Sequence, residues 1–305
     1  MMAIHSMMGL THLDLGRNQF SGTFPAWFAD LTLQSITVSD NFLEGTLPQS
    51  LMRLGDRLEL LAVDGNRMSG NLAALQSLTC LRILYLENNQ FQDTMDDTFL
   101  LNMPELIQLD ASDNLLNGTL PVHLLDNQRM KSLQVLDLSR NHLTGSLPTA
   151  LLTRNTVLDF LSLHHNQLTG QIPDSLCNNL EMLYHLDLAS NRLSGPLPDS
   201  LGMGNLRHLF LAENGFDPGP IPEAYRRLIQ LRDLSLGGTQ RTGTIPRWLG
   251  GLRQLILLDL DSNQLNGTLP IELGHLSYLS LLFLSRNQLS GTMPTELGVL
   301  GRLCK

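Results

Sequence analysis

Histidines and aromatic residues gather in one stretch of the chain, between residues 160 and 210. Four of the nine histidines fall there, at positions 164, 165, 185 and 208. With an acid and three aromatic side chains, they could support nucleophilic catalysis, metal binding or recognition of another molecule. Seven candidates, called here the recognition patch, are expected to face outward from neighbouring strands: Phe160, His164, Tyr184, His185, Asp187, His208 and Phe210.

Each kind of chemistry makes different demands on these side chains. Ser162, His164 and Asp187 are the residue types of a Ser-His-Asp triad, but an open sheet offers neither a pocket nor oxyanion donors. His185 and His208 could coordinate zinc together with Asp187, although the pattern supplies no further ligand. Rigid aromatic side chains with a polar rim are typical of interfaces. Recognition is therefore preferred, with ordinary surface variation as the alternative, and histidine titration would make binding change at roughly pH 6 to 7.

A repeated unit positions these side chains. The segment 255–265 reads L-x-x-L-x-L-x-x-N-x-L, and the same pattern recurs along the whole chain. Its last two leucines alternate with polar residues, as a strand with one buried face requires. The asparagine slot is filled at 18, 41, 66, 89, 114, 141, 166, 191, 214, 263 and 287, and once by Thr239, which gives twelve units.

The parts of one unit predict its local structure. Asn141 follows a strand at a turn, where its amide can bond backbone groups that the bend leaves unpaired. Gly145 then relaxes the backbone, and Pro148 ends further strand pairing. Leucines at every third position, as in 294–303, suit a short 3₁₀ or helical segment. Because one unit cannot bury its leucines alone, the units must stack into one continuous core.

Two neighbouring irregularities interrupt this pattern. One residue is inserted in the segment 216–220, and the next unit replaces both its asparagine and the following apolar residue in 237–241. Their proximity predicts a loop or a local change of curvature. Drift tolerated in a long array is the alternative, because the stability of a repeat array is roughly a sum of local terms.

Composition excludes several classes of protein. The chain has 305 residues and 71 leucines, yet only 16% of its residues are charged, against about 25% in ordinary domains. A net charge of −9 without a basic cluster argues against nucleic-acid binding. No apolar run approaches about 20 residues, so we expect no membrane-spanning helix in this segment. No phosphate loop, kinase lysine motif, H-E-x-x-H or clustered C-x-x-C occurs, so we expect no enzymatic activity, cofactor or metal.

The repeated unit resembles that of leucine-rich repeat proteins, specifically the plant-type subclass with L-x-G-x-[IL]-P after the asparagine. The hallmark is found at 43–48 and 168–173, and at 289–294 with methionine in its fifth place. Members include ectodomains of receptor-like kinases, receptor-like proteins and polygalacturonase inhibitors. The resemblance implies an α/β solenoid, a horseshoe or superhelix of about twelve repeats, whose parallel sheet lines a concave binding face.

The resemblance also implies a function. We expect a non-enzymatic recognition module of a receptor-like or secreted protein, with a protein or peptide, or a glycan, as its ligand. An intracellular scaffold or regulator is one alternative. The ectodomain of a receptor kinase, with its catalytic domain outside these residues, is the other.

The cysteines and sequons bear on compartment and completeness. Plant-type extracellular members usually carry cysteine-paired caps, whereas Cys80, Cys177 and Cys304 lie in distant units and predict free thiols. We therefore expect one array over residues 1–305, a piece of a longer protein without its caps, with ends covered by a partner as the alternative. Asn117 and Asn266 begin glycosylation sequons, and the resemblance favours the cell exterior over the cytoplasm.

Overall fold

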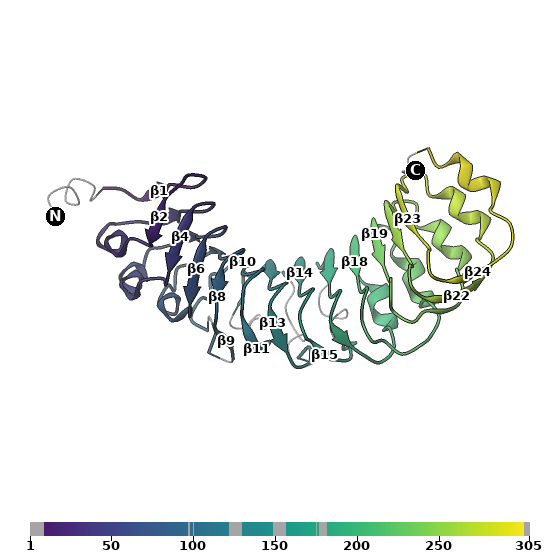
Figure 1. The fold of residues 1–305 in the computed structure, drawn as a ribbon, viewed down its shortest axis with the longest axis horizontal. Helices are drawn as coiled ribbons and strands as arrows, with labels where there is room; N and C mark the ends of the chain where they lie inside the picture. The colour runs from purple at the N-terminus through teal and green to yellow at the C-terminus, as the bar shows by residue number, and fades with distance from the viewer. Residues whose placement is uncertain are drawn as a thin grey trace. The chain divides into compact units, whose positions relative to one another are not determined.

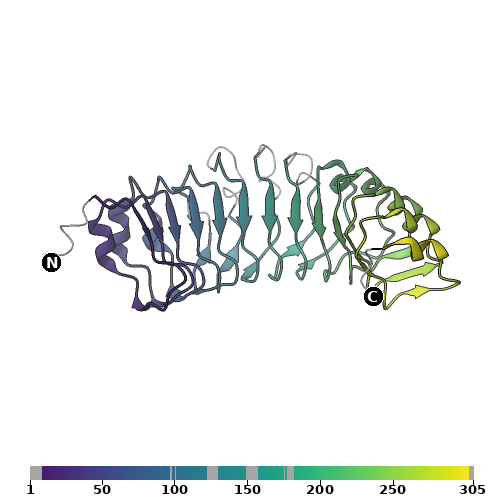
Figure 2. The same ribbon diagram turned by 90° about the horizontal axis from the view of Figure 1, so that it is seen from above.

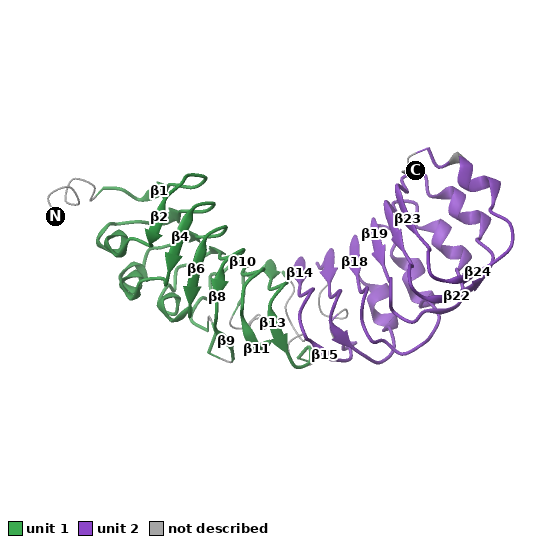
Figure 3. Cartoon of the chain, viewed as in Figure 1, with its two compact units in different colours: residues 1–158 green, residues 159–305 purple. Residues whose placement is uncertain are grey.

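The chain folds into stacked short strands joined by loops and 3₁₀ helices (Figures 1 and 2). The computed structural model describes residues 9–96, 98–99, 101–121, 130–148, 157–174, 176 and 182–301. Contacts divide the chain into two compact units, residues 1–158 and 159–305 (Figure 3). Both compact units have the same arrangement, in which each sequence repeat contributes one principal strand.

The first unit contains a principal sheet of parallel strands, a second set of shorter strands and three described 3₁₀ helices. The principal strands are β1 (His12–Asp14), β3 (Ser35–Thr37), β5 (Leu60–Ala62), β7 (Ile83–Tyr85), β10 (Gln108–Asp110) and β12 (Val135–Asp137). The shorter strands are β2 (Ser21–Thr23), β4 (Phe42–Gly45), β6 (Arg67–Gly70), β8 (Gln90–Phe91), β9 (Thr94–Met95), β11 (Asn117–Thr119) and β13 (His142–Thr144). The helices are η1 (Ala26–Asp30), η2 (Gln49–Leu54) and η3 (Ala73–Leu75).

The second unit repeats these layers. Its principal strands are β14 (Phe160–Ser162), β16 (His185–Asp187), β18 (His208–Phe210), β19 (Asp233–Ser235), β21 (Leu257–Asp259) and β23 (Leu281–Phe283). Its shorter strands are β15 (Thr169–Gly170), β17 (Arg192–Leu193), β20 (Thr242–Thr244), β22 (Gln264–Gly267) and β24 (Gln288–Leu289). Its described helices are η6 (Asp199–Met203), η7 (Glu223–Arg227), η8 (Arg247–Gly251), η9 (Ile271–His275) and η10 (Thr295–Val299). The solenoid of about twelve repeats predicted from the sequence is thus confirmed.

The strand register explains why one face of each principal sheet is buried. Leu84 lies opposite Leu61 on one side and Leu109 on the other, and all three side chains are fully buried. The residues that flank them in each strand are more exposed. The leucines therefore line the core between the sheet and the outer loops, and the alternate residues stand on the open face of the sheet.

Asparagines at the strand ends form a ladder of hydrogen bonds from one repeat to the next. Asn41 donates from Nδ2 to the carbonyls of Leu15 and Val38, both at 3.0 Å, and its Oδ1 accepts a bond from the backbone N–H of Phe20 at 2.9 Å. Each such side chain thus bonds its own turn to the preceding repeat. The residue before each ladder position is left-handed even without glycine, with φ of 54° at Asp40. Such a backbone is costly, and it persists where surrounding contacts determine it.

The two sequence irregularities form one structure. Arg241 stands where other repeats bury an apolar residue such as Leu265, and only 2% of its surface is exposed. Its guanidinium donates to the carbonyls of Asp217 at 2.5 Å, Pro220 at 3.4 Å and Thr239 at 2.7 Å. The first two carbonyls belong to the inserted loop. Insertion and substitution therefore compensate each other, because the buried guanidinium bonds the carbonyls that the loop turns inward.

Two remaining expectations concern the cysteines and the membrane. Cys80 is a free thiol and is partly buried, as expected, whereas Cys177 and Cys304 lie outside the described residues. Across the described part of the chain, no helix is long and apolar enough to cross a membrane.

Candidate functional site

The recognition patch lies on three neighbouring strands of the second unit and on residues that flank them, His164 after β14 and Tyr184 before β16. In the strand register, His185 of β16 stands opposite Phe160 of β14 on one side and His208 of β18 on the other. Asp187 stands opposite Phe210 in the parallel row. Because neighbouring strands are about 4.8 Å apart, side chains in one row can touch. The repeat thus brings together residues that are 25 and 23 positions apart in the sequence.

Four ring contacts join five of the seven patch residues. His185 stacks on Phe160, with ring centroids 4.1 Å apart and planes at 15°. It also lies 5.4 Å from the ring of His208 and 5.7 Å from that of Phe210. Tyr184 meets His208 edge-on at 6.3 Å. His185 is therefore the centre of an aromatic cluster on an open sheet.

The charge state of His185 follows from this packing. Burial, and after it the nearby His208 and His164, lower the pKa of His185 to about 4. At neutral pH its ring is uncharged and acts as a flat, weakly polar surface beside Phe160. The expectation that the patch histidines titrate at roughly pH 6 to 7 is therefore wrong for His185.

An acid that the sequence analysis did not select completes the cluster. Asp233 of β19 stands opposite His208, and its Oδ2 lies 2.5 Å from His208 Nδ1. Both side chains are about one quarter exposed or less. The interaction holds the orientation of the His208 ring and favours a proton on Nδ1. The repeat register, which places Asp233 in the row of His185 and His208, could have identified it.

The other two patch residues have local partners. His164 Nδ1 lies 2.8 Å from Nδ1 of His165, and their rings meet edge-on at 5.0 Å. Asp187 accepts the backbone N–H of Ala189 at its own turn, 3.0 Å away. Among the described interactions, the ring of His164 contacts that of His165 and no ring of the aromatic cluster, and Asp187 bonds its own turn.

Asp110 and Asp137, which hold the position of Asp187 in earlier strands, serve the same structural purpose. Asp110 Oδ1 accepts the N–H of Ser112 at 2.9 Å and its hydroxyl at 2.7 Å. Asp137 bonds Ser139 in the same way, at 2.9 and 2.6 Å. Where an aspartate occupies this position, its carboxylate therefore holds the turn, which explains the aspartates without invoking catalysis.

Catalysis and metal binding find little support in this geometry. Ser162, the candidate nucleophile, is only 2% exposed. In the described ranges, no three side chains of histidine, cysteine, aspartate or glutamate are grouped so that they could hold a metal ion. The contacts of the patch are instead those of a surface that another molecule can cover.

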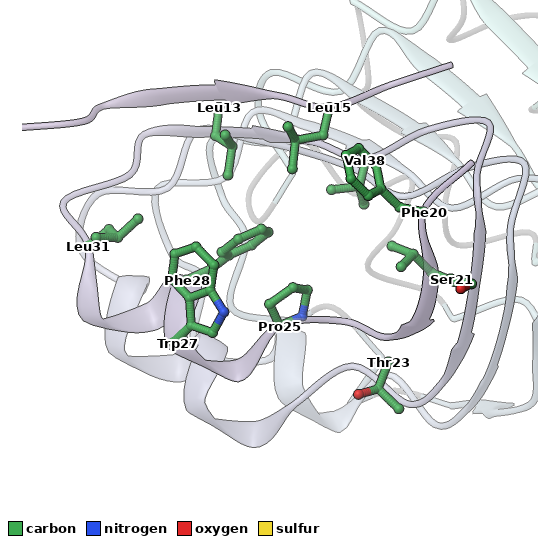
Figure 4. Close-up of a pocket in the computed structure, with 11 residues that line it drawn as sticks. Leu13, Leu15, Phe20, Ser21, Thr23, Pro25, Trp27, Phe28, Leu31 and Val38 are labelled. Atoms are coloured by element: carbon green, nitrogen blue, oxygen red, sulfur yellow. The ribbon is translucent and has the colours of Figure 1, made fainter. Parts of the chain in front are cut away.

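Two hollows of the first unit differ in chemistry from the patch. An apolar pocket of about 330 Å³ opens into the core of the first described repeat, with Leu13, Phe20 and Trp27 on its walls (Figure 4). The lining of a shallow hollow of about 470 Å³ on the open face includes Arg17, Tyr85 and four acids, Asp14, Asp40, Asp64 and Glu87. There, burial and the charge of Asp110 raise the pKa of Glu87 to about 7. No ionisable group lines the apolar pocket, so it continues the leucine core rather than forming a polar site.

The two sequons differ in exposure. Asn117 of β11 is half-buried, and its Oδ1 accepts a bond from the hydroxyl of Thr94 at 3.0 Å. Asn266 of β22 is exposed, and so is Thr268 of its sequon. Glycosylation at either position stays a prediction, and the structure favours Asn266 because a glycan there displaces no described hydrogen bond.

Comparison with known proteins agrees with the fold. The model of the family described as Leucine Rich Repeat matches residues 9–31, 132–153, 157–179, 182–203 and 254–276. The chain is an array of leucine-rich repeats. Among curated proteins, it is 39% identical to Receptor-like protein 18 of Arabidopsis thaliana over 113 residues, and 39% identical to Receptor-like protein 35 of the same plant over 110 residues. These alignments cover 37% and 36% of this chain, and 13% and 11% of the two relatives.

Solved structures of plant receptors superpose on nearly the whole leucine-rich repeat array. The crystal structure of a TDR receptor matches 99% of this chain with a TM-score of 0.90 and 30% identity. The plant peptide hormone receptor RGFR1 in complex with RGF2 matches 97% with a TM-score of 0.86 and 29% identity. The array spans about half the length of each of these receptor chains, 52% and 46%.

Proposed function

We propose that this leucine-rich repeat array is a non-catalytic recognition module of a receptor-like protein, and that it binds a peptide segment on the open, concave face of its principal sheet. The observation that carries the proposal is the aromatic cluster around His185, with Phe160 stacked on it and Phe210 beside it. Rigid rings lose little conformational entropy on binding, so a cluster of them is a favourable anchor for a ligand.

The relatives support a ligand of this kind. Curated proteins similar to this chain are named receptor-like proteins, and one similar structure is a peptide hormone receptor in complex with RGF2. Another is PEPR1 with AtPEP1, which matches 97% of this chain with a TM-score of 0.72 and 28% identity. An extended peptide suits a surface of parallel strands, because alternate side chains can contact successive rows.

The geometry of the patch also supports a non-catalytic role. The hydroxyl of Ser162 is buried, Asp187 holds a turn, and His164 has His165 as its nearest ring. A nucleophile, a base and an orienting acid within mutual hydrogen-bond reach are the minimum for acyl transfer. The described residues of the patch provide aromatic rings in contact rather than a nucleophile, a base and an acid joined by hydrogen bonds.

The test is selection of peptides from a random library displayed on phage. The wild-type chain should enrich a defined set of sequences, and the triple variant F160A/H185A/F210A should lose that enrichment. A matched control is M203A/I229A/I271A, which truncates three exposed apolar side chains outside the principal strands. The control should enrich the same peptides as wild type.

The outcome is judged only for chains that remain folded. Circular dichroism melts of the three proteins should agree within a few degrees, because the patch side chains are half-buried rather than core residues. Equal enrichment by wild type and the patch variant would refute the proposal. So would loss of enrichment by the control variant alone.

A further inference from the structure

Two arginines stand beside the recognition patch at equivalent places in adjacent repeats. Arg207 immediately precedes β18, and Arg232 immediately precedes β19. Backbone bonds align them: the N–H of Arg207 donates to Tyr184 O at 2.8 Å, and the N–H of Arg232 donates to Arg207 O at 2.7 Å. Tyr184, Arg207 and Arg232 therefore form one row across three neighbouring repeats, next to the row of His185 and His208.

Both guanidinium groups lack a carboxylate partner within the part of the chain that the structure describes. Arg207 and Arg232 are exposed, and neither forms an ion pair with any residue that the structure describes. The acid nearest in the register, Asp233, is already held by His208 Nδ1. Like charges at equivalent places in adjacent repeats repel each other, so an anion bound between the two guanidinium groups would relieve this repulsion.

The place of this charge distinguishes it. The net charge of the chain is −9, and among the described residues six other arginines have carboxylate partners, for example Arg226 with Glu223 and Arg286 with Asp261. Other exposed arginines, such as Arg82 and Arg253, form no ion pair with a described residue either, so the pair at 207 and 232 is set apart by its position next to the aromatic cluster. An acidic protein with an unpaired arginine pair beside an aromatic cluster presents a local attraction for an anion. A planar guanidinium matches the two oxygens of a carboxylate better than a point charge does.

We propose that Arg207 and Arg232 form an anion subsite that binds the side-chain carboxylate of an acidic residue in the peptide held by the aromatic cluster. This inference rests on the proposed function. Tyr184 links the two parts, because it belongs to the row of the arginines and its ring meets that of His208. The ligand is thus a peptide with an aromatic or large aliphatic residue for the cluster and an acid for the arginines.

The spacing between the two ligand groups follows from the strands. Arg207 and His208 are consecutive residues, and neighbouring strands of the sheet are about 4.8 Å apart. Since an extended peptide advances about 3.3 to 3.6 Å per residue, the acid lies within about three positions of the apolar residue.

An internal acid fits this place better than a chain terminus. The sheet continues beyond the arginines through β21 and β23, which present Leu257, Leu281 and Phe283 on the open face. A peptide that reaches the arginines can therefore continue over further apolar side chains instead of ending there.

The experiment compares three forms of the full 305-residue chain in the phage selection. The peptides are displayed through their C-termini, so only side chains can supply a carboxylate. Wild type should enrich peptides with Asp or Glu within about three residues of an aromatic or large aliphatic residue. R207Q/R232Q should retain the apolar preference and lose the acidic one. The control R253Q, which removes an exposed arginine elsewhere in the same unit, should behave as wild type.

Binding measurements then assign the charge. The most enriched peptide, synthesised with a C-terminal amide, should bind about tenfold more weakly when its acid is replaced by the corresponding amide residue. The same replacement should change binding to R207Q/R232Q less than about twofold. A peptide with a free C-terminal carboxylate and no acidic side chain tests the other source of the anion, and it should gain nothing from the arginines.

The outcomes separate this inference from the proposed function. Loss of all enrichment in the patch variant, with acidic preference unchanged in R207Q/R232Q, overturns the anion subsite and leaves the recognition patch standing. Enrichment that the patch variant F160A/H185A/F210A retains overturns the proposed function itself. Dependence on the terminal carboxylate alone overturns the assignment to an acidic side chain.

Discussion

The buried arginine of the second unit offers the sharpest test of how this array tolerates irregular repeats. Arg241→Ala removes the guanidinium that bonds the carbonyls of Asp217, Pro220 and Thr239. Thr239 is fully buried, so water cannot replace the lost bond to its carbonyl, whereas Asp217 and Pro220 are exposed residues that can be rehydrated.

The magnitude can be built from these parts. An orphaned buried carbonyl costs about 1–3 kcal/mol. Loss of two buried methylenes from the arginine stem adds about 1.6 kcal/mol. Relief of the buried charge offsets part of this sum, although removal of one partner from a buried polar pair is usually costly overall. We expect the free energy of unfolding to fall by about 3 kcal/mol for Arg241→Ala, and by about half as much for Arg241→Leu, which restores the packing found at Leu265.

The assay combines urea unfolding with hydrogen exchange. The N–H of Asp217 bonds Gly195 O at 2.8 Å, and the N–H of Thr242 bonds Gly219 O at 2.8 Å, so both amides report on the inserted loop. They should exchange faster in both variants than in wild type. Arg253→Ala, an exposed control, should change stability by less than about 0.5 kcal/mol. A leucine variant at position 241 that is as stable as wild type, with unchanged exchange at these amides, would refute the reasoning.

Three further perturbations address the ladder and the open face. Glu87→Gln should stabilise the first unit at pH 8 by about 1–2 kcal/mol after allowance for solvent screening. Because the pKa of Glu87 is raised to about 7 in the folded chain, wild type loses stability as the pH rises from about 4.5 through 7. Urea unfolding should therefore show no difference between the variant and wild type at pH 4. The ring of His185 should titrate in NMR spectra with a midpoint near its pKa of about 4 and no step between roughly pH 8 and 6, and a midpoint above 6 would contradict the lowered pKa. The contribution of the neutral ring to stability is complete above the usual pKa of histidine and is lost as the pH falls through 4. Asn141→Ala should lower the free energy of unfolding by about 2–4 kcal/mol in urea unfolding. The substitution removes the acceptor for the buried N–H of Leu116 at 2.9 Å and the donor to Ala111 O at 2.9 Å. A change below about 0.5 kcal/mol would argue against the ladder.

The sequence predicts the fold well because the core positions repeat in type as well as in place. Leucines at fixed spacing define the strands, and Asn141 and its equivalents define the turns. The left-handed residue before each asparagine was not predicted, because the position holds unlike residue types, among them Arg17, Ser190 and Glu213, which carry no residue-type signal for positive φ. That conformation is imposed by ladder bonds from two repeats, so it appears only when the repeats are stacked.

The candidate site could be predicted only in part. Rows of outward residues followed from the register, and they placed Phe160, His185 and His208 side by side. The charge state of His185 did not follow, because it depends on how far neighbouring rings exclude water. Asp233 was not predicted because it lies on β19, one strand beyond the last histidine of the cluster. The partners of Arg241 were missed because they are backbone carbonyls, which carry no residue-type signal.

The two parts of the proposed binding surface should respond differently to solution conditions. His185 is neutral over the physiological range, so the contact of its cluster with an apolar side chain depends on buried area and should hardly change with salt. Arg207 and Arg232 are exposed, so their attraction for a carboxylate falls as ions screen it over about 10 Å at 0.1 M salt. Raising the salt concentration should therefore weaken binding of the acidic peptide to wild type only until it equals binding to R207Q/R232Q. A further fall beyond that level would mean that charges outside this pair also hold the ligand.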